Sequence, residues 1–292
     1  MLTKSQKAVL YMIGSVVCFS SMDLIVKYLN NVPFGQVLFM RFFFGMIPIF
    51  FLIPRDKIFT FYKTKRPVLH AFRAVSGTIA IIALFVALRN LPLTDVISLT
   101  FTGPLFVTIM SVIFLSEKVG IRRWSAVLIG FIGMLFIVRP AFEEMNLYYI
   151  FPIIFSLGFA NVAISIRSLS KTEPNYLIAF YFSLLSLLVA LGTIVNGWIW
   201  PTPYEALLFA ILGLSGGVAN LLLTQSYRLA DASLVSPIKY LSLIVAVVAG
   251  YLIFSEVPKP MTLFGASLVV VSSFIIFRRE ATLKKQVVAP RI

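Results

Sequence analysis

Ten apolar segments, each close to the length of a membrane-crossing helix, follow one another along this chain with short connections between them. About twenty apolar residues are needed to cross roughly 30 Å of hydrocarbon as a helix. The composition agrees, because 60% of the residues are hydrophobic and only 12% are charged, unlike a soluble domain. We therefore predict an all-α integral membrane protein with ten transmembrane helices, at 7–29, 34–53, 70–88, 92–115, 121–138, 147–166, 175–196, 205–227, 233–254 and 261–277.

The stretch 88–120 indicates an internal duplication, because a degenerate copy of it returns at 227–259. At one fixed offset, Ser76, Gly77, Ala80, Arg89, Ser116, Glu117 and Arg139 fall on Ser215, Gly216, Ala219, Arg228, Ser255, Glu256 and Arg278. Each half has five spans, an odd number, so the second half must enter the membrane upside down, as in many secondary transporters. We expect two inverted five-helix repeats around a central cavity, at 1–140 and 146–279, followed by a basic cytoplasmic tail at 280–292. The two Ser-Glu pairs are interpreted as helix-end caps.

The net charge of +14 is a topology signal, because the basic residues gather in alternate connections. Eighteen of them fall on one side of the predicted topology, whereas only Arg89, Arg139 and Lys259 fall on the other. This asymmetry predicts a multi-pass protein of the inner (cytoplasmic) membrane with both termini in the cytoplasm. It argues against nucleic acid as the partner of the basic residues.

Four cations inside the predicted spans need a separate explanation: Lys27, Arg41, Arg73 and Lys239. A charge facing lipid at mid-helix costs about 2.5 to 3.5 kcal/mol, so such residues usually face a bundle interior or a wet cavity. Snorkelling of the long side chain to the interface is the alternative, and it applies best to Lys27 and Arg73 near their helix ends. Arg41 and Lys239 lie deeper and favour a functional cavity.

Asp23 is the one acidic residue well inside a span, and Lys27 follows at i+4 on the same helix face. Either the two form an internal ion pair that fixes the first helix, or the same pair opens for a substrate. With this pair neutralised the remaining cations leave the cavity net positive, which favours a substrate with a carboxylate or phosphate group.

Polar and aromatic residues inside the later spans extend the candidate substrate site. Asn161, Asn220 and Gln225 serve either as ligand contacts or as interhelical hydrogen bonds, and Tyr240 either stacks on a substrate ring or packs. Gly103-Pro104 and Pro237 are expected to interrupt the fourth and ninth spans, where a freed carbonyl can help to form a site.

The single Cys18 and single His70 leave little from which to build a metal site or an enzyme. We therefore expect no metal, no cofactor and no catalytic residues. His70 begins the third span beside Arg66 and is interpreted as an interfacial, water-facing histidine.

The whole chain resembles the EamA-type drug/metabolite transporters, through ALRNLPLTDVISLTFTGPLF, FLSEKVGIRRW with GFIGMLFIVRP, and RLADASLVSPIKYLSLI with GYLIFSEVP. SSMDLIVKYL, MRFFFG, RPVLHAFRAV and SPIKYLSL are similar to the S-adenosylmethionine uptake transporters of that family. The resemblance implies ten helices, two five-helix repeats and a small-molecule substrate. Many members carry an acidic residue where this chain has Lys239. The lysine in this chain fits the positive cavity.

We thus predict a secondary transporter of a small zwitterionic or anionic metabolite, with S-adenosylmethionine as the named substrate. Its partners are that small molecule and the lipid bilayer. An amino-acid exporter or a riboflavin permease of the same superfamily is the alternative within the class. A structural or lipid-handling membrane protein, in which the intramembrane cations are dispensable, is the alternative from another class.

Overall fold

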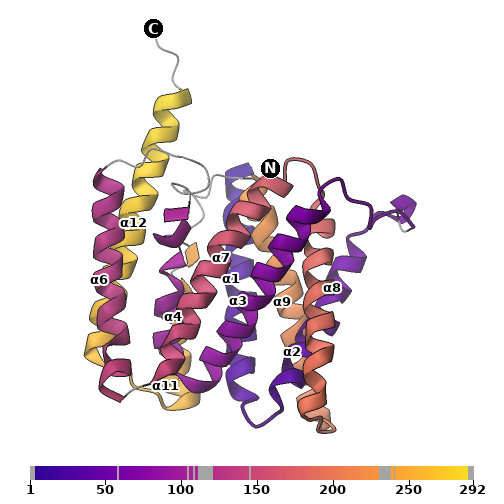
Figure 1. Ribbon diagram of the computed structural model, residues 1–292, viewed down its shortest axis with the longest axis horizontal. Helices are drawn as coiled ribbons and strands as arrows, with labels where there is room; N and C mark the ends of the chain where they lie inside the picture. Colours follow the sequence, from indigo (N-terminus) through magenta and orange to yellow (C-terminus); the bar gives the residue numbers. More distant parts are fainter. Residues whose placement is uncertain are drawn as a thin grey trace.

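The protein is all-helical in a computed structural model, which describes residues 4–57, 59–103, 105–107, 109–110, 121–144, 146–229, 238–239 and 241–288. These residues form ten α-helices (Figure 1): α1 Lys4–Tyr28, α2 Phe34–Phe51, α3 Pro67–Asn90, α4 Leu93–Thr100, α6 Ile121–Glu144, α7 Ile150–Leu169, α8 Asn175–Thr193, α9 Pro203–Leu229, α11 Leu241–Phe254 and α12 Pro260–Val288. Short 3-10 turns lie at Arg55–Lys57 (η1), Leu147–Tyr149 (η2) and Ile194–Asn196 (η3). Each of the ten helices overlaps one predicted span.

The lengths of the helices fit a membrane protein. Six described segments are long and apolar enough to cross a bilayer, and α4, α6, α11 and α12 contribute shorter apolar stretches. Large hydrophobic side chains cover the outside of these helices, among them Phe51 at 85% exposure and Leu128 at 63%. Because water would penalise such a surface, lipid is the solvent that it fits.

The fourth span is interrupted, as predicted. α4 ends at Thr100, and Phe101 and Thr102 form a turn before the helical stretch resumes. A proline at position 104 cannot donate a hydrogen bond to the carbonyl of Thr100, four residues earlier. The Ser156 hydroxyl of α7 donates to that carbonyl and to the carbonyl of Leu99, at 3.3 and 3.2 Å. A neighbouring helix therefore satisfies the backbone at the break.

In the ninth span, the described residues just before α11 are not α-helical. Ile238 and Lys239 form a 3-10 turn, and α11 begins only at Leu241, while Pro237 lies outside the described residues. The Ser242 hydroxyl donates to the Lys239 carbonyl at 2.7 Å. Lys239 therefore lies in a 3-10 turn that precedes α11.

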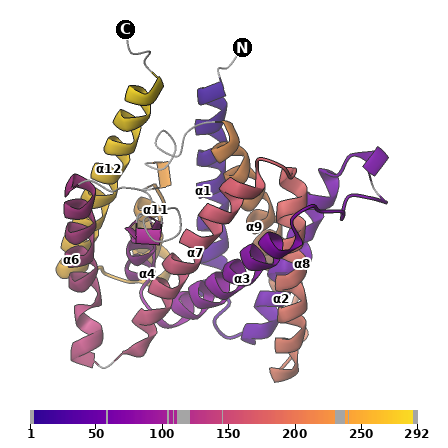
Figure 2. The ribbon, with the colours of Figure 1, turned by 45° about the horizontal axis from the view of Figure 1, so that its top comes forward.

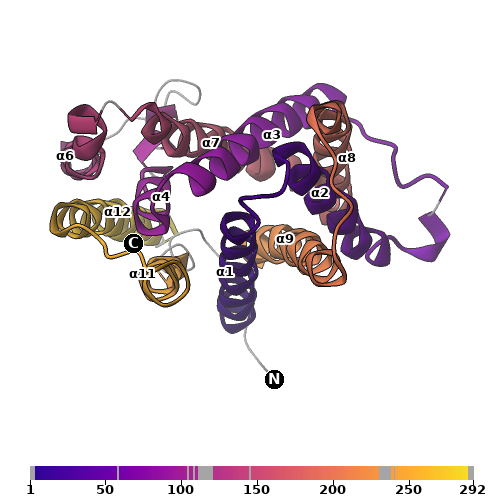
Figure 3. The ribbon, with the colours of Figure 1, turned by 90° about the horizontal axis from the view of Figure 1, so that it is seen from below.

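The packing of the helices follows the inverted repeat. The counterparts along the two halves are α1 and α7, α2 and α8, α3 and α9, α4 and α11, and α6 and α12. α1 packs along α9 while α7 packs along α3, and α2 contacts α9 while α8 contacts α3 (Figure 3). The remaining close pairs, α2 with α8, α4 with α11 and α6 with α12, each join two counterparts. This arrangement is the one that a pseudo-two-fold axis in the membrane plane produces.

The bundle has two ends. The start of α1 and the end of α12 lie at the same end (Figure 2), which we call the proximal end. The turns from α1 to α2, α3 to α4 and α11 to α12 lie at the opposite, distal end (Figure 1). An even number of crossings requires both termini to share one side.

Glycines allow the closest helix contacts. A Cβ at Gly217 of α9 would lie 2.4 Å from the Gly45 carbonyl oxygen of α2. A Cβ at Gly133 of α6 would lie 2.7 Å from the Gly265 carbonyl oxygen of α12. In lipid, where apolar burial gives little drive, such backbone proximity supplies the packing energy between helices.

Candidate functional site

Arg41 lies in the helical core, where α2 meets α1 and α9. Its side chain is 2% exposed, its Nε donates to the sulfur of Met22 at 3.1 Å, and its guanidinium lies 5.0 Å from the Phe42 ring. A Cβ at Gly216 would lie only 2.1 Å from the Arg41 Nε. The glycine of α9 is therefore what makes room for the guanidinium.

Asp23 of α1 interacts electrostatically with Arg41, which lies on α2. Its carboxylate is 8% exposed, and its Oδ1 is buried with no hydrogen-bond partner. A charge in a low-dielectric interior is costly without an opposite charge, so the two residues are best understood as one unit. Arg41 is therefore the cation that offsets the charge of Asp23, although no ion pair within 4 Å joins the two among the described residues.

The predicted ion pair between Asp23 and Lys27 is wrong. Lys27 binds Glu256 instead, with 2.7 Å between Nζ and the carboxylate, and its Nζ also donates to the carbonyls of Leu91 at 2.7 Å and Leu88 at 3.4 Å. The i+4 spacing places Lys27 on the same helix face as Asp23 but at the distal end of α1. A partner from the α11–α12 connection is nearer there.

Glu256 also caps a helix, in agreement with the interpretation of its Ser-Glu pair. Its Oε2 accepts a hydrogen bond of 2.7 Å from the backbone N–H of Leu93, the first residue of α4. The N-terminal end of a helix carries unpaired N–H groups and a positive partial charge, which a carboxylate satisfies. One side chain therefore links α1, α4 and the α11–α12 connection.

Two further contacts reinforce the distal end. Arg89 donates to the Leu29 carbonyl at 2.9 Å, and the Tyr149 hydroxyl donates to the Asp95 carboxylate at 2.5 Å. We call Lys27, Arg89, Asp95, Tyr149 and Glu256 the distal polar cluster. Its members come from α1, α3, α4, η2 and the α11–α12 connection, so this cluster holds both repeats together at one end.

Arg73 and His70 lie in α3 against α8. Arg73 is 2% exposed, and its guanidinium lies 4.0 Å from the Phe182 ring, while its Nε and Nη1 have no hydrogen-bond partner. His70 is 1% exposed, with its ring 4.7 Å from that of Tyr181. The interpretation of His70 as water-facing is therefore wrong, because α8 covers this face of α3.

Arg41 and Arg73 are connected through two aromatic rings that the sequence did not single out. Phe42, beside Arg41, meets Phe182, beside Arg73, edge to face at 5.5 Å between ring centroids. Only helix packing reveals that the two arginines are joined by these rings, because Phe42 and Phe182 belong to different repeats.

Lys239 lies among aromatic side chains. Its Nζ lies 4.3 Å from the Phe159 ring of α7 and 5.4 Å from the Tyr227 ring of α9. In the part of the chain that the structure describes, no carboxylate forms an ion pair with it. Its ammonium is therefore a half-buried cation held by ring faces.

The remaining candidate residues are less informative. Asn161, Asn220 and Gln225 are half-buried on α7 and α9, and Tyr240 lies outside the described residues. Among the described residues no group of three or more His, Cys, Asp or Glu could hold a metal ion.

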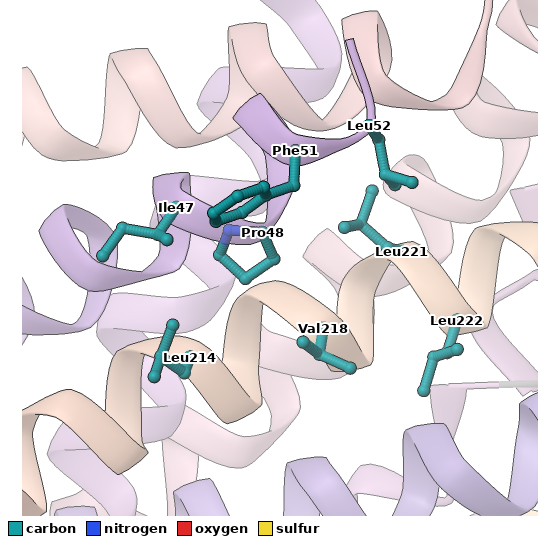
Figure 4. Close-up of a pocket in the computed structure, with 8 residues that line it drawn as sticks. All are labelled: Ile47, Pro48, Phe51, Leu52, Leu214, Val218, Leu221 and Leu222. Carbon is teal, nitrogen blue, oxygen red and sulfur yellow. The ribbon is translucent and has the colours of Figure 1, made fainter.

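An apolar groove lies between α2 and α9 (Figure 4), with a volume of about 410 Å³. Its lining residues are Ile47, Pro48, Phe51, Leu52, Leu214, Val218, Leu221 and Leu222. None of these side chains carries a charge or a hydrogen-bonding group. The groove therefore does not suit a charged metabolite.

The fold and the buried charges define a multi-pass membrane protein built as an inverted repeat, an architecture of secondary transporters. The chain belongs to the EamA-like transporter family, whose model matches residues 6–139 and 146–278. It is a transporter and not an enzyme.

Several curated relatives match nearly the whole chain. An S-adenosylmethionine uptake transporter of Rickettsia bellii is 30% identical over 276 residues, 94% of each chain. The pseudopaline exporter CntI of Pseudomonas aeruginosa is 27% identical, covering 90% of this chain and 93% of its own. A riboflavin transporter of Vibrio cholerae is 28% identical over 93% of each chain. A solved crystal structure shares the fold with a TM-score of 0.66 at 15% identity, covering 97% of this chain and 99% of the other.

Proposed function

We propose that this protein moves a small zwitterionic or anionic metabolite across the inner membrane by alternating access, with S-adenosylmethionine uptake or exchange as the particular activity. The main support is the set of buried and half-buried cations, because Arg73 and Lys239 have no carboxylate partner among the described residues. A net positive interior favours a substrate that brings its own carboxylate. The relatives from Rickettsia support the choice of substrate.

In this proposal Asp23 meets a cationic group of the substrate, and Arg41, Arg73 or Lys239 meets its carboxylate. Lys27, Asn161, Asn220, Gln225 and Tyr240 complete the proposed substrate site. The first repeat at 1–140 and the second at 146–279 surround a central cavity, and both termini and the tail at 280–292 face the cytoplasm.

Uptake into liposomes tests the activity. Purified protein is reconstituted into liposomes loaded with unlabelled S-adenosylmethionine, and entry of the labelled compound is measured. We expect exchange by the wild type and at least a tenfold loss in Arg41→Met, because the variant leaves Asp23 buried without its cation. Lys171→Met, which removes an exposed cation outside the helices, is the matched control and should retain the wild-type rate.

The alternative is an exporter of amino acids or related metabolites, or a riboflavin permease, and the pseudopaline and riboflavin relatives support it. Liposomes that exchange riboflavin or an amino acid but not S-adenosylmethionine would refute the substrate and keep the class. In cells, rescue of an auxotroph indicates uptake, whereas resistance to a toxic analogue indicates export.

A further inference from the structure

We propose that Phe159 and Tyr227 form a subsite for the positively charged onium group of the substrate, which Lys239 occupies when no substrate is bound. This inference rests on the proposed function, since it assigns residues to the recognition of a sulfonium zwitterion. Neither ring stands out in the sequence, and only the packing of α7 and α9 around the 3-10 turn at Ile238 and Lys239 brings them to Lys239.

The first step of the argument is the nature of the Lys239 environment. Its ammonium has two ring faces within about 6 Å, the range in which the ring quadrupole attracts a cation. An ammonium with a carboxylate at hand would pair with it, and the described part of the chain provides none. The two rings are thus a site that selects positive charge and is already filled by a side chain.

The second step concerns position. Phe159 stacks on Phe155 of the same helix, with ring centroids 5.8 Å apart, and a Cβ added at Gly103, beside the α4 break, would lie 3.7 Å from the Phe159 ring. Phe19 of α1, Phe159 and Tyr227 all pack against one hydrophobic core formed by residues of α1 and α9. The two rings therefore lie among α1 and α4 of the first repeat and α7 and α9 of the second. Alternating access requires a substrate site in such a position.

The third step is an exchange of partners. Bound S-adenosylmethionine carries one carboxylate, one α-ammonium and one sulfonium, and the sulfonium is the onium group assigned to the two rings. Its carboxylate draws the flexible Lys239 ammonium off the ring faces into a charge-assisted hydrogen bond, and the onium group takes the place of that ammonium. The number of charges on the rings is unchanged, so the exchange adds an ion pair without losing a cation–π contact. The corresponding thioether keeps the α-ammonium and the carboxylate but has no charge on sulfur, so its sulfur would leave the rings without a cation.

Paired ligands test the subsite. Binding of S-adenosylmethionine, a sulfonium, and of S-adenosylhomocysteine, the thioether that has no charge on sulfur, is measured on the purified full-length protein by competition with labelled ligand. We expect Phe159→Leu to weaken sulfonium binding about fivefold to thirtyfold and thioether binding less than twofold, from the usual strength of a desolvated cation–π contact. Tyr227→Leu should act in the same direction, whereas Phe159→Trp and Tyr227→Phe keep a ring and should keep the selectivity.

Phe155→Leu is the matched control, because Phe155 has the same neighbourhood on α7 but does not contact Lys239 among the described interactions. If Phe159→Leu is monodisperse and loses affinity for both ligands equally, the ring only packs and the inference is overturned. The proposal that the protein transports S-adenosylmethionine would be unaffected by this result. If the wild type binds neither adenosyl ligand, the proposed substrate is refuted. In that case, binding of S-methylmethionine and of methionine is compared in the same variants. A variant that no longer prefers the sulfonium supports the subsite, whereas an unchanged preference overturns it.

Discussion

Removing the negative charge of Glu256 is expected to open the distal end of the bundle. In Glu256→Gln the amide oxygen can still accept a hydrogen bond from the Leu93 N–H, and Lys27 still donates to the Leu91 carbonyl, so the ion pair is the interaction lost. The Lys27 and Glu256 side chains are 11% and 22% exposed, between a surface pair and a buried one.

The magnitude follows from that exposure. Exposed ion pairs contribute about 0–1 kcal/mol, and hydrogen bonds to charged groups about 1.5–3 kcal/mol. We therefore expect the pair to contribute about 1–2 kcal/mol to the state in which the distal end is closed. At 1.4 kcal/mol for each factor of ten, its loss raises the open population about fivefold to thirtyfold.

Thiol labelling measures this population. Cys18→Ser removes the chain's one cysteine, and Ser20→Cys then places a reporter at a position that is 8% exposed, one helix turn before Asp23. A membrane-impermeant thiol reagent, added at the distal side, should label this reporter about fivefold to thirtyfold faster in Glu256→Gln.

The control for labelling is Glu205→Gln. Glu205 is also acidic and caps a helix, but its contacts are with Thr202 of the same segment. This variant should leave the labelling rate unchanged. Equal rates in Glu256→Gln and Glu205→Gln would refute the reasoning, because the ion pair would then contribute nothing to closure.

Two other predictions address the buried arginines. Gly216→Ala should destabilise the protein by about 1–3 kcal/mol in a thermal unfolding assay, because the new Cβ would overlap the Arg41 guanidinium. Gly192→Ala, where nothing lies within 4 Å, should be neutral or stabilising, and equal effects of the two would contradict the packing argument. A double-mutant cycle of Arg73→Met and Phe182→Leu should give a coupling energy of about 0.5–2 kcal/mol, and a value near zero would show that the 4.0 Å contact carries no interaction.

The positions of the helices could be predicted because each follows from local chemistry. A membrane-spanning helix satisfies its backbone within its own segment, so the length of an apolar run is enough to locate it. The break in the fourth span follows equally from Gly103-Pro104. A proline has no N–H, so the carbonyl of Thr100, four residues earlier, loses its helical hydrogen bond. The interpretation of His70 failed because proximity to a helix end does not say which neighbour covers that end.

The sequence by itself determined the solvent of this protein, the ten spans, their duplication and, through an odd number of spans in each half, the opposite orientation of the two halves. It also identified the buried charges as the residues that need explanation. Only the tertiary structure decided their partners: Glu256 for Lys27, the Met22 sulfur and the Phe42 ring for Arg41, and the rings of Phe159 and Tyr227 for Lys239. The physical reason is that these contacts join helices distant in the chain, and the inverted packing of the two repeats determines which helices meet.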